Sequence, residues 1–223
     1  MFLPIPKVLK EAELRQVREA LAQAKFDDGA PSAGRQARRV KRNEQLPRDS
    51  EAAKKMGGIV SGALRRHAAF ISAALPYRMT EPLFNRYAPG MRYGAHIDNA
   101  IMFQTPPLRS DVSVTVFLSE PSEYDGGELV MEEIGARRKL KLAAGAALLY
   151  PSTSLHRVEP VTRGARLAAV LWVQSLVRDA EQRRLLFELD RATQAVARRT
   201  ADAPELALLG KTYHNLLRMW AGA

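Results

Sequence analysis

The sequence predicts an α+β protein in which a β-sandwich or jelly roll is flanked by helical regions. The prediction rests on three zones: residues 1–77 are helical and basic, residues 78–178 hold short strand-like pieces, and residues 179–223 are helical again. Short strands separated by frequent turns are typical of antiparallel sandwiches rather than of alternating strand–helix units. We therefore expect a β-core in the middle zone, with helices covering the outer face of one sheet.

The N-terminal zone contains two helical patterns with a basic segment between them. In residues 10–25, apolar side chains recur at helical spacing until Asp28-Gly29. A second helix is predicted after Ser50. Its apolar stripe consists of Met56, Val60, Ala63, Leu64 and His67. We expect His67 to be a packed core residue, whereas the Arg-rich residues 30–49 predict a loop or a ragged strand.

The middle zone contains a clear two-residue alternation in the stretch DVSVTVFLS. Its apolar face carries Val112, Val114, Val116 and Leu118, and Ser113, Thr115 and Phe117 lie on the other face. Turn signals at residues 88–90, 125–127, 144–145 and 163–164 separate the remaining pieces. These pieces are PLFNRYA, GELVMEE, RRKLKLA, AALLYP, HRVEPV and RLAAVLWVQ.

The C-terminal zone predicts two helices. Asp179 with Gln182 resembles a capping box, and the helix that follows has a stripe of Leu185, Leu186, Leu189, Ala192 and Val196. The second helix follows Pro204 and contains His214, to which we assign no chemistry. Its Leu and Trp side chains make a homo-oligomer through these helices an expectation.

Composition limits the possible functions. The chain has no cysteine, which excludes disulfides, thiolate metal sites and a cysteine nucleophile. The start MFLPIPKVLK lacks the apolar segment of a signal peptide, and no apolar run approaches the roughly 20 residues of a membrane span. A cytoplasmic protein is therefore expected, with no membrane partner. The net charge of +10 favours anionic partners, but many basic residues lie beside acidic ones, so nucleic acid is not the expected partner.

A candidate metal site lies in the stretch RYAPGMRYGAHIDNA. His96 and Asp98 are two residues apart, so on a strand both side chains point to one face. His156 is the only other histidine in the middle zone. Two histidines and one carboxylate form a facial triad that leaves positions open on non-haem Fe(II). Zinc accepts the same ligands, but no general base for hydrolysis is evident beside them.

Arg166 is the candidate anion-binding residue. It follows His156 by ten residues, after a turn, at the start of the apolar strand RLAAVLWV. A guanidinium in such a strand requires an anionic partner, and a carboxylate held bidentately fits. A structural ion pair, or an edge-strand arginine that reaches water, is the alternative.

Three stretches carry a family resemblance: RYAPGMRYGAHIDNAIM, RSDVSVTVFLSEPSEYDGGELV and AGAALLYPSTSLHRVEPVTRGAR. They resemble the PKHD-type hydroxylases, which are Fe(II)/2-oxoglutarate dioxygenases related to prolyl and lysyl hydroxylases. The resemblance implies a double-stranded β-helix core, with iron held by His96, Asp98 and His156. It also implies that Arg166 and Tyr87 bind 2-oxoglutarate. Phe117 stands where some relatives carry a second tyrosine.

The same resemblance implies a hydroxylase that uses O₂, converts 2-oxoglutarate to succinate and takes L-ascorbate as reductant. The substrate would be a small molecule or a peptide, with a link to iron or siderophore metabolism. Tyr93 and Asn99 either orient ligands or fill turn and packing positions. Arg109 and Asp111 either face the cleft or form an ordinary ion pair, and we favour the ion pair.

Two alternatives follow from the positive charge. An AlkB-like nucleic-acid demethylase would carry paired arginines, and Arg157 and Arg163 have the internal spacing of that pair but begin too soon after His156. A non-enzymatic module would bind nucleic-acid phosphates through the basic segment 35–42 and would not need the triad.

Overall fold

The core of the computed structural model, which describes residues 1–133 and 135–222, consists of two antiparallel sheets. The larger sheet contains, in spatial order, β1 (Leu3–Ile5), β14 (Ala147–Pro151), β10 (Val112–Phe117), β17 (Arg166–Ser175), β6 (Leu83–Tyr87), β4 (Glu44–Gln45) and β2 (Asp27–Asp28), and β5 (Pro76–Met79) also pairs with β17. The second sheet contains β13 (Ala136–Leu140), β12 (Leu129–Glu133), β15 (Leu155–Val158), β7 (Arg92–His96) and β3 (Lys41–Arg42). Two short pairs complete the β-structure: β11 (Tyr124–Gly126) with β16 (Val161–Gly164), and β8 (Ile101–Met102) with β9 (Leu108–Arg109).

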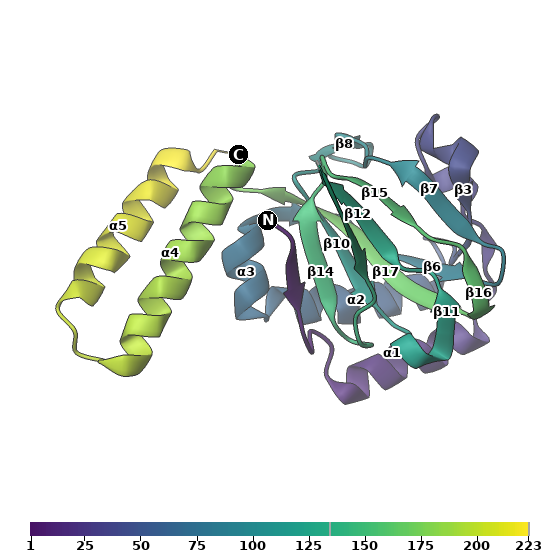
Figure 1. Cartoon of the computed structure of the whole chain (residues 1–223), viewed down its shortest axis with the longest axis horizontal. Helices are drawn as coiled ribbons and strands as arrows, with labels where there is room; N and C mark the ends of the chain where they lie inside the picture. Colours follow the sequence, from purple (N-terminus) through teal and green to yellow (C-terminus); the bar gives the residue numbers. More distant parts are fainter. Residues whose placement is uncertain (134, 223) are drawn as a thin grey trace.

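The two sheets face each other, and a small core lies between them (Figure 1). It contains Tyr87 and Phe117 from the larger sheet and Leu129 and Met131 from the second one. The predicted β-sandwich, or jelly roll, is therefore confirmed.

The larger core lies on the outer face of the larger sheet. There the helices α1 (Glu11–Gln23), α2 (Glu51–Arg65) and α3 (Ala68–Ala74) pack on β10 and β17. The predicted alternation in β10 holds, and Val112, Val114 and Val116 face these helices. The opposite face of β10 is also buried, although its pattern is typical of a half-buried strand, because the second sheet covers it. This buried face carries the hydroxyls of Ser113 and Thr115.

The helix boundaries follow local signals. The hydroxyl of Ser50 accepts a hydrogen bond from the Ala53 amide and caps α2 as expected. The predicted apolar stripe of this helix included His67, but α2 ends at Arg65. His67 lies between α2 and α3 and is the N-cap residue of α3. Between α1 and α2, the basic segment forms short 3-10 helices at Ala30–Ser32 and Ala37–Val40 and the short strands β2, β3 and β4.

The C-terminal helices α4 (Ala180–Arg199) and α5 (Glu205–Trp220) form a pair beside the β-core, next to α3 (Figure 1). They therefore do not lie on a sheet face, in contrast to the expectation. The predicted stripe on α4 is also partly wrong: Leu186 is buried with Arg183 and Phe187, whereas Leu185 is 46% exposed. On the inward face, the Arg183 guanidinium donates hydrogen bonds to the carbonyls of Val177 and Arg178, so a charged residue that is no part of an apolar stripe occupies a buried position.

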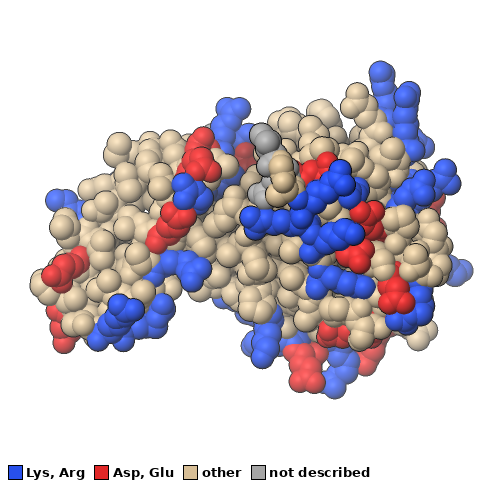
Figure 2. All heavy atoms as spheres, in the orientation of Figure 1, with Lys and Arg blue, Asp and Glu red and all other residues tan. Residues whose placement is uncertain are grey.

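Surface charges are mixed. Figure 2 shows acidic side chains beside basic ones on the visible face, and Arg157, for example, pairs with Glu132 and Glu159. Among the helices in the described part of the chain, none has both the length and the apolar composition needed to cross a bilayer.

Candidate active site

His96, Asp98 and His156 meet between the sheets. His96 is the last residue of β7, and it lies directly opposite His156 on the neighbouring strand β15. Asp98 follows two residues after β7. One ligand atom from each residue lies within 4.8 Å of the others, and His156 Nε2 is 3.9 Å from Asp98 Oδ1. Two imidazoles and one carboxylate at this separation can hold a divalent metal ion and leave other positions free.

Hydrogen bonds orient the two imidazoles. The Nδ1 of His96 lies 2.8 Å from the carbonyl oxygen of Gly94, and the Nδ1 of His156 lies 3.0 Å from that of Ser154. When Nδ1–H donates to a carbonyl, the lone pair of Nε2 is free for a metal. Burial and the nearby His156 lower the pKa of His96 to about 4, which keeps its ring neutral.

The carboxylate is oriented from the buried polar face of β10. Ser113 donates its hydroxyl hydrogen bond to Asp98 Oδ2, and its Oγ is 2.8 Å from the Oγ of Ser152. On the other side of the site, the Tyr93 ring stacks on the His96 ring at 3.5 Å between centroids. Ser113 therefore orients the Asp98 carboxylate, and Tyr93 adds to the orientation of His96 that the Gly94 carbonyl gives.

Arg166 lies at the start of β17, opposite Tyr87 on β6, and only 2% of it is exposed. Its guanidinium carbon lies 5.3 Å from the Tyr87 ring and 5.5 Å from the Phe117 ring. In the described part of the chain, no carboxylate pairs with Arg166, and its Nε has no hydrogen-bond partner. Burial raises the pKa of Tyr87 to about 12, so its hydroxyl stays protonated as a donor. An orphaned buried cation of this kind fits an anionic ligand.

The triad and Arg166 line one cavity, which is open at its mouth and has a volume of about 840 Å³ with its open part included. Gly127 packs closely beside the arginine: a Cβ there would lie 2.9 Å from Val161 Cγ2, 3.1 Å from Tyr124 Cε2 and 3.2 Å from Arg166 Cδ, and the backbone has a φ of +66°. The turn predicted at residues 125–127 therefore also has a packing role beside the cavity, through Gly127.

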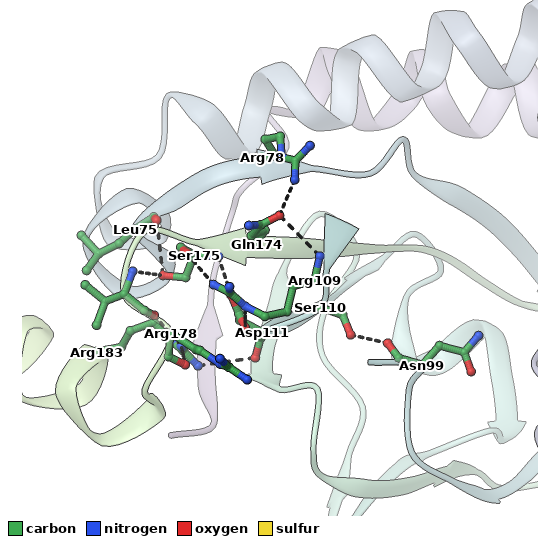
Figure 3. Close-up of polar contacts among 11 residues, drawn as sticks. Leu75, Arg78, Asn99, Arg109, Ser110, Asp111, Gln174, Ser175, Arg178 and Arg183 are labelled. Atoms are coloured by element: carbon green, nitrogen blue, oxygen red, sulfur yellow. Dashed lines mark hydrogen bonds and ion pairs between the residues drawn. The ribbon is translucent and has the colours of Figure 1, made fainter. Parts of the chain in front are cut away.

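Tyr93 and Asn99 line the cavity, whereas Arg109 and Asp111 do not. Arg109 and Asp111 form a two-point ion pair at 2.8 and 3.0 Å, as favoured from the sequence (Figure 3). Asp111 also accepts a hydrogen bond from the Ser175 amide, and Ser110 donates to the Asn99 carbonyl. This network joins the chain segment beside the triad to β17.

Two basic residues of the N-terminal zone, Lys41 and Arg48, also line the cavity, and the sequence did not predict this. Lys41 on β3 is opposite Tyr93 on β7, only 8% of it is exposed, and its Nζ lies 2.7 Å from Ser32 Oγ. Burial and the nearby Arg48 lower the pKa of Lys41 to about 8. Arg48 lines the same cavity. No sequence signal separates these two from the other basic residues of the segment.

The other two histidines do not line the cavity, and His67 is half-buried rather than the core residue that was predicted. His67 lies at the junction of α2 and α3, and His214 is exposed on α5. Arg157 and Arg163 do not line the cavity either; each pairs with acidic side chains, and Arg163 binds Asp125 at 2.6 Å.

An antiparallel double-layered β-core with a His–Asp–His cluster and a buried arginine inside defines the class of 2-oxoglutarate/Fe(II) oxygenases. Comparison with known families agrees: the 2OG-Fe(II) oxygenase superfamily matches residues 82–174, and the PKHD-type hydroxylase C-terminal domain matches residues 180–222. The chain belongs to the PKHD-type hydroxylase family, as the sequence resemblance predicted, and is a 2-oxoglutarate-dependent dioxygenase.

Relatives are similar over their whole length. A PKHD-type hydroxylase of Hyphomonas neptunium is 53% identical over 100% of both chains, and one of Xanthomonas euvesicatoria is 51% identical over 99% of both. Among solved structures, a Pseudomonas putida prolyl-4-hydroxylase has a TM-score of 0.54 at 20% identity, covering 78% of this chain and 92% of that one. A Trichoplax adhaerens prolyl hydroxylase has a TM-score of 0.57 at 20% identity, covering 83% and 86%. These structural similarities concern the fold.

Proposed function

We propose that His96, Asp98 and His156 bind Fe(II), that Arg166 and Tyr87 bind 2-oxoglutarate, and that the protein hydroxylates a C–H bond of a small-molecule or peptidyl substrate. The observation that carries this proposal is the convergence of the three candidate ligands within 4.8 Å, in the same cavity as an arginine without a counter-ion.

The donor set fits both groups. The two Nε2 atoms and the Asp98 carboxylate are ligands that Fe(II) accepts, and the guanidinium of Arg166 matches the planar carboxylate at the distal end of 2-oxoglutarate. When bound, iron and 2-oxoglutarate supply the oxidising chemistry, in which O₂ is reduced, 2-oxoglutarate becomes succinate and CO₂, and a C–H bond becomes C–OH.

The side chains of this chain position the reactants. The carbonyls of Gly94 and Ser154 hold the imidazoles in one tautomer, and Ser113 holds the carboxylate. The Tyr87 hydroxyl lies near the buried cation and stays protonated, so it donates to the same carboxylate group of the co-substrate. Phe117, in place of a second tyrosine, offers its ring face to Arg166 instead of a hydroxyl.

We further propose L-ascorbate as the reductant that keeps the iron ferrous. A role in iron or siderophore metabolism rests on the family resemblance alone. For an AlkB-like activity the arginine positions are unfavourable, since Arg157 and Arg163 are engaged by carboxylates outside the cavity.

The test is formation of succinate by purified protein with Fe(II), 2-oxoglutarate and ascorbate, without added substrate. We expect slow succinate formation that His96→Ala, Asp98→Ala and His156→Ala abolish. His214→Ala is the matched control, because His214 is exposed on α5, and it should keep wild-type turnover. Succinate formation that survives in the three triad variants would overturn the proposal.

A further inference from the structure

A second cavity continues the one that holds the triad. The outer cavity, of about 1530 Å³ with its open part, shares Ser32, Arg48, Leu83, Asn99, Met102 and Trp172 with the inner cavity. The two cavities therefore form one groove that runs from the triad to the surface. The basic N-terminal segment contributes one wall, and residues 99–104 contribute another.

The groove has an excess of positive charge at the junction of its two parts. Apart from the histidines, the charged side chains that line the inner cavity are Lys41, Arg48, Asp98 and Arg166. In the proposed function Asp98 faces the metal and Arg166 faces 2-oxoglutarate. Neither Lys41 nor Arg48 then forms an ion pair with a carboxylate in the described residues, although Asp28 is near enough to attract Lys41, and Arg48 forms no hydrogen bond there.

Burial is the largest cause of the lowered pKa of Lys41, and repulsion by the nearby Arg48 adds to it, whereas Asp28 and Asp98 act in the opposite direction. Two neighbouring cations, one of them buried, are costly unless an anion binds between them. Among the outer lining residues that the structure describes, Glu81 is the only acidic one, and it forms no ion pair with Lys41 or Arg48.

The groove also has an apolar side. Leu83, Met102 and Trp172 line both of its parts, and Phe103 lines the outer part with 91% of its side chain exposed. A ligand that fills the groove therefore meets two cations on one side and apolar surface on the other.

We infer that the substrate carries a carboxylate that Lys41 and Arg48 bind, and an apolar portion that lies along Met102 and Trp172. This inference rests on the proposed function, because it takes the triad as the reaction centre. The two oxygens of a carboxylate satisfy both cations at once. The remaining basic residues of the segment, such as Arg35, are exposed and do not line the groove.

The test uses Trp172 as a reporter. The chain has two tryptophans, so Trp220→Phe leaves Trp172 alone. This protein, loaded with Zn(II) and saturating 2-oxoglutarate so that it does not turn over, is titrated with hexanoate and with its neutral analogue hexanamide. We expect hexanoate to change the Trp172 fluorescence with an affinity at least about tenfold higher than hexanamide, the effect of one charge-assisted hydrogen bond.

Arg48→Gln and Lys41→Gln should each remove this preference, and Arg48→Gln is the safer variant because Arg48 is solvent-exposed. Arg35→Gln makes the same charge change outside the groove and should retain the preference. Equal affinities for hexanoate and hexanamide would overturn the inference, and stronger binding of hexyl phosphate would overturn the choice of a carboxylate.

Arg166→Gln separates the two carboxylate sites. The hexanoate preference should persist in this variant. If Arg166→Gln abolishes it while Arg48→Gln retains it, the anion binds at the co-substrate arginine and the inference fails, although the proposed function stands. The proposed function fails independently, in the succinate assay of the triad variants.

Discussion

Replacing Arg166 with methionine should move protein stability and co-substrate affinity in opposite directions. The guanidinium is buried without a carboxylate partner, and its cation–π contacts with the rings of Tyr87 and Phe117 stabilise it by about 0.5–2 kcal/mol each. Desolvating the ion costs several kcal/mol, and apolar replacements of buried ions are often stabilising by about 1–4 kcal/mol. We expect the ligand-free Arg166→Met protein to gain roughly 1–3 kcal/mol, with Tm raised by about 2–4 °C for each kcal/mol.

The same substitution should remove most of the affinity for 2-oxoglutarate. Two hydrogen bonds from a guanidinium to a carboxylate contribute about 1.5–3 kcal/mol each, so the Kd should rise by about a hundredfold or more. Wild-type protein gains stability in proportion to the logarithm of the ligand concentration over Kd. At a concentration that shifts the Tm of the wild type, the variant should show no shift, while its metal binding stays mostly unchanged.

Scanning calorimetry of the Zn(II)-loaded proteins, with and without 2-oxoglutarate, measures both effects. Arg157→Met is the control, since Arg157 is paired with Glu132 and Glu159 outside the cavity. That variant should lose stability and keep the full ligand shift. A ligand-free Arg166→Met protein that melts below the wild type would refute the reasoning, because it would mean that the arginine already has a stabilising partner.

Three further outcomes are expected. The pKa of His96 is lower in the folded protein than in the unfolded chain, so the unfolded chain binds more protons and the free energy of unfolding should fall as the pH drops from about 6.5 to about 4. Urea unfolding of the metal-free protein at several pH values should show this dependence in the wild type and in His214→Ala, and a weaker one in His96→Ala. An equal pH dependence in all three proteins would contradict the assignment. Ser113→Ala removes the hydroxyl that donates to Asp98, and it should weaken the metal affinity about 10–100-fold while the protein stays folded. Competition with a chelator measures this affinity, and an unchanged value would contradict the role of the hydrogen bond. Asp111→Asn breaks a nearly buried ion pair and should lower the free energy of unfolding by about 3–5 kcal/mol, whereas a loss below about 1 kcal/mol would mean that the network of Figure 3 carries little stability.

The strands that could be predicted from the sequence are those with a local pattern of polar and apolar residues. β10 has six residues that alternate in polarity, and β17 has ten residues in a largely apolar run, so each shows its own local pattern. The N-terminal strands β1 to β4 have two or three residues each and exist through pairing with distant strands, so no local periodicity reveals them. The break at His67 was also invisible, because apolar spacing continues across it.

The residues of the candidate site also fall into those that the sequence predicts and those that only the tertiary structure reveals. His96 and Asp98 are adjacent enough to be recognised together, and His156 followed from the small number of histidines in the β-zone. Lys41 and Arg48 could not be separated from a solvated basic run, since only the tertiary placement of β3 and of the chain before α2 brings them to the cavity. The division at residues 77 and 178 and a homo-oligomer through α4 and α5 stay predictions.

The position of His96 directly across from His156 has a consequence for how this enzyme can diversify. Neighbouring antiparallel strands fix their facing residues at about 4.5–5.5 Å between Cα atoms, so the distance between the imidazoles is inherited from the backbone ladder rather than from the intervening chain. Loops between the two histidines can lengthen or change and reshape the groove without dismantling the centre. Conversely, a one-residue slip of either strand would turn an imidazole to the wrong face, so the proposed metal centre would be lost although all three proposed ligands remain in the sequence.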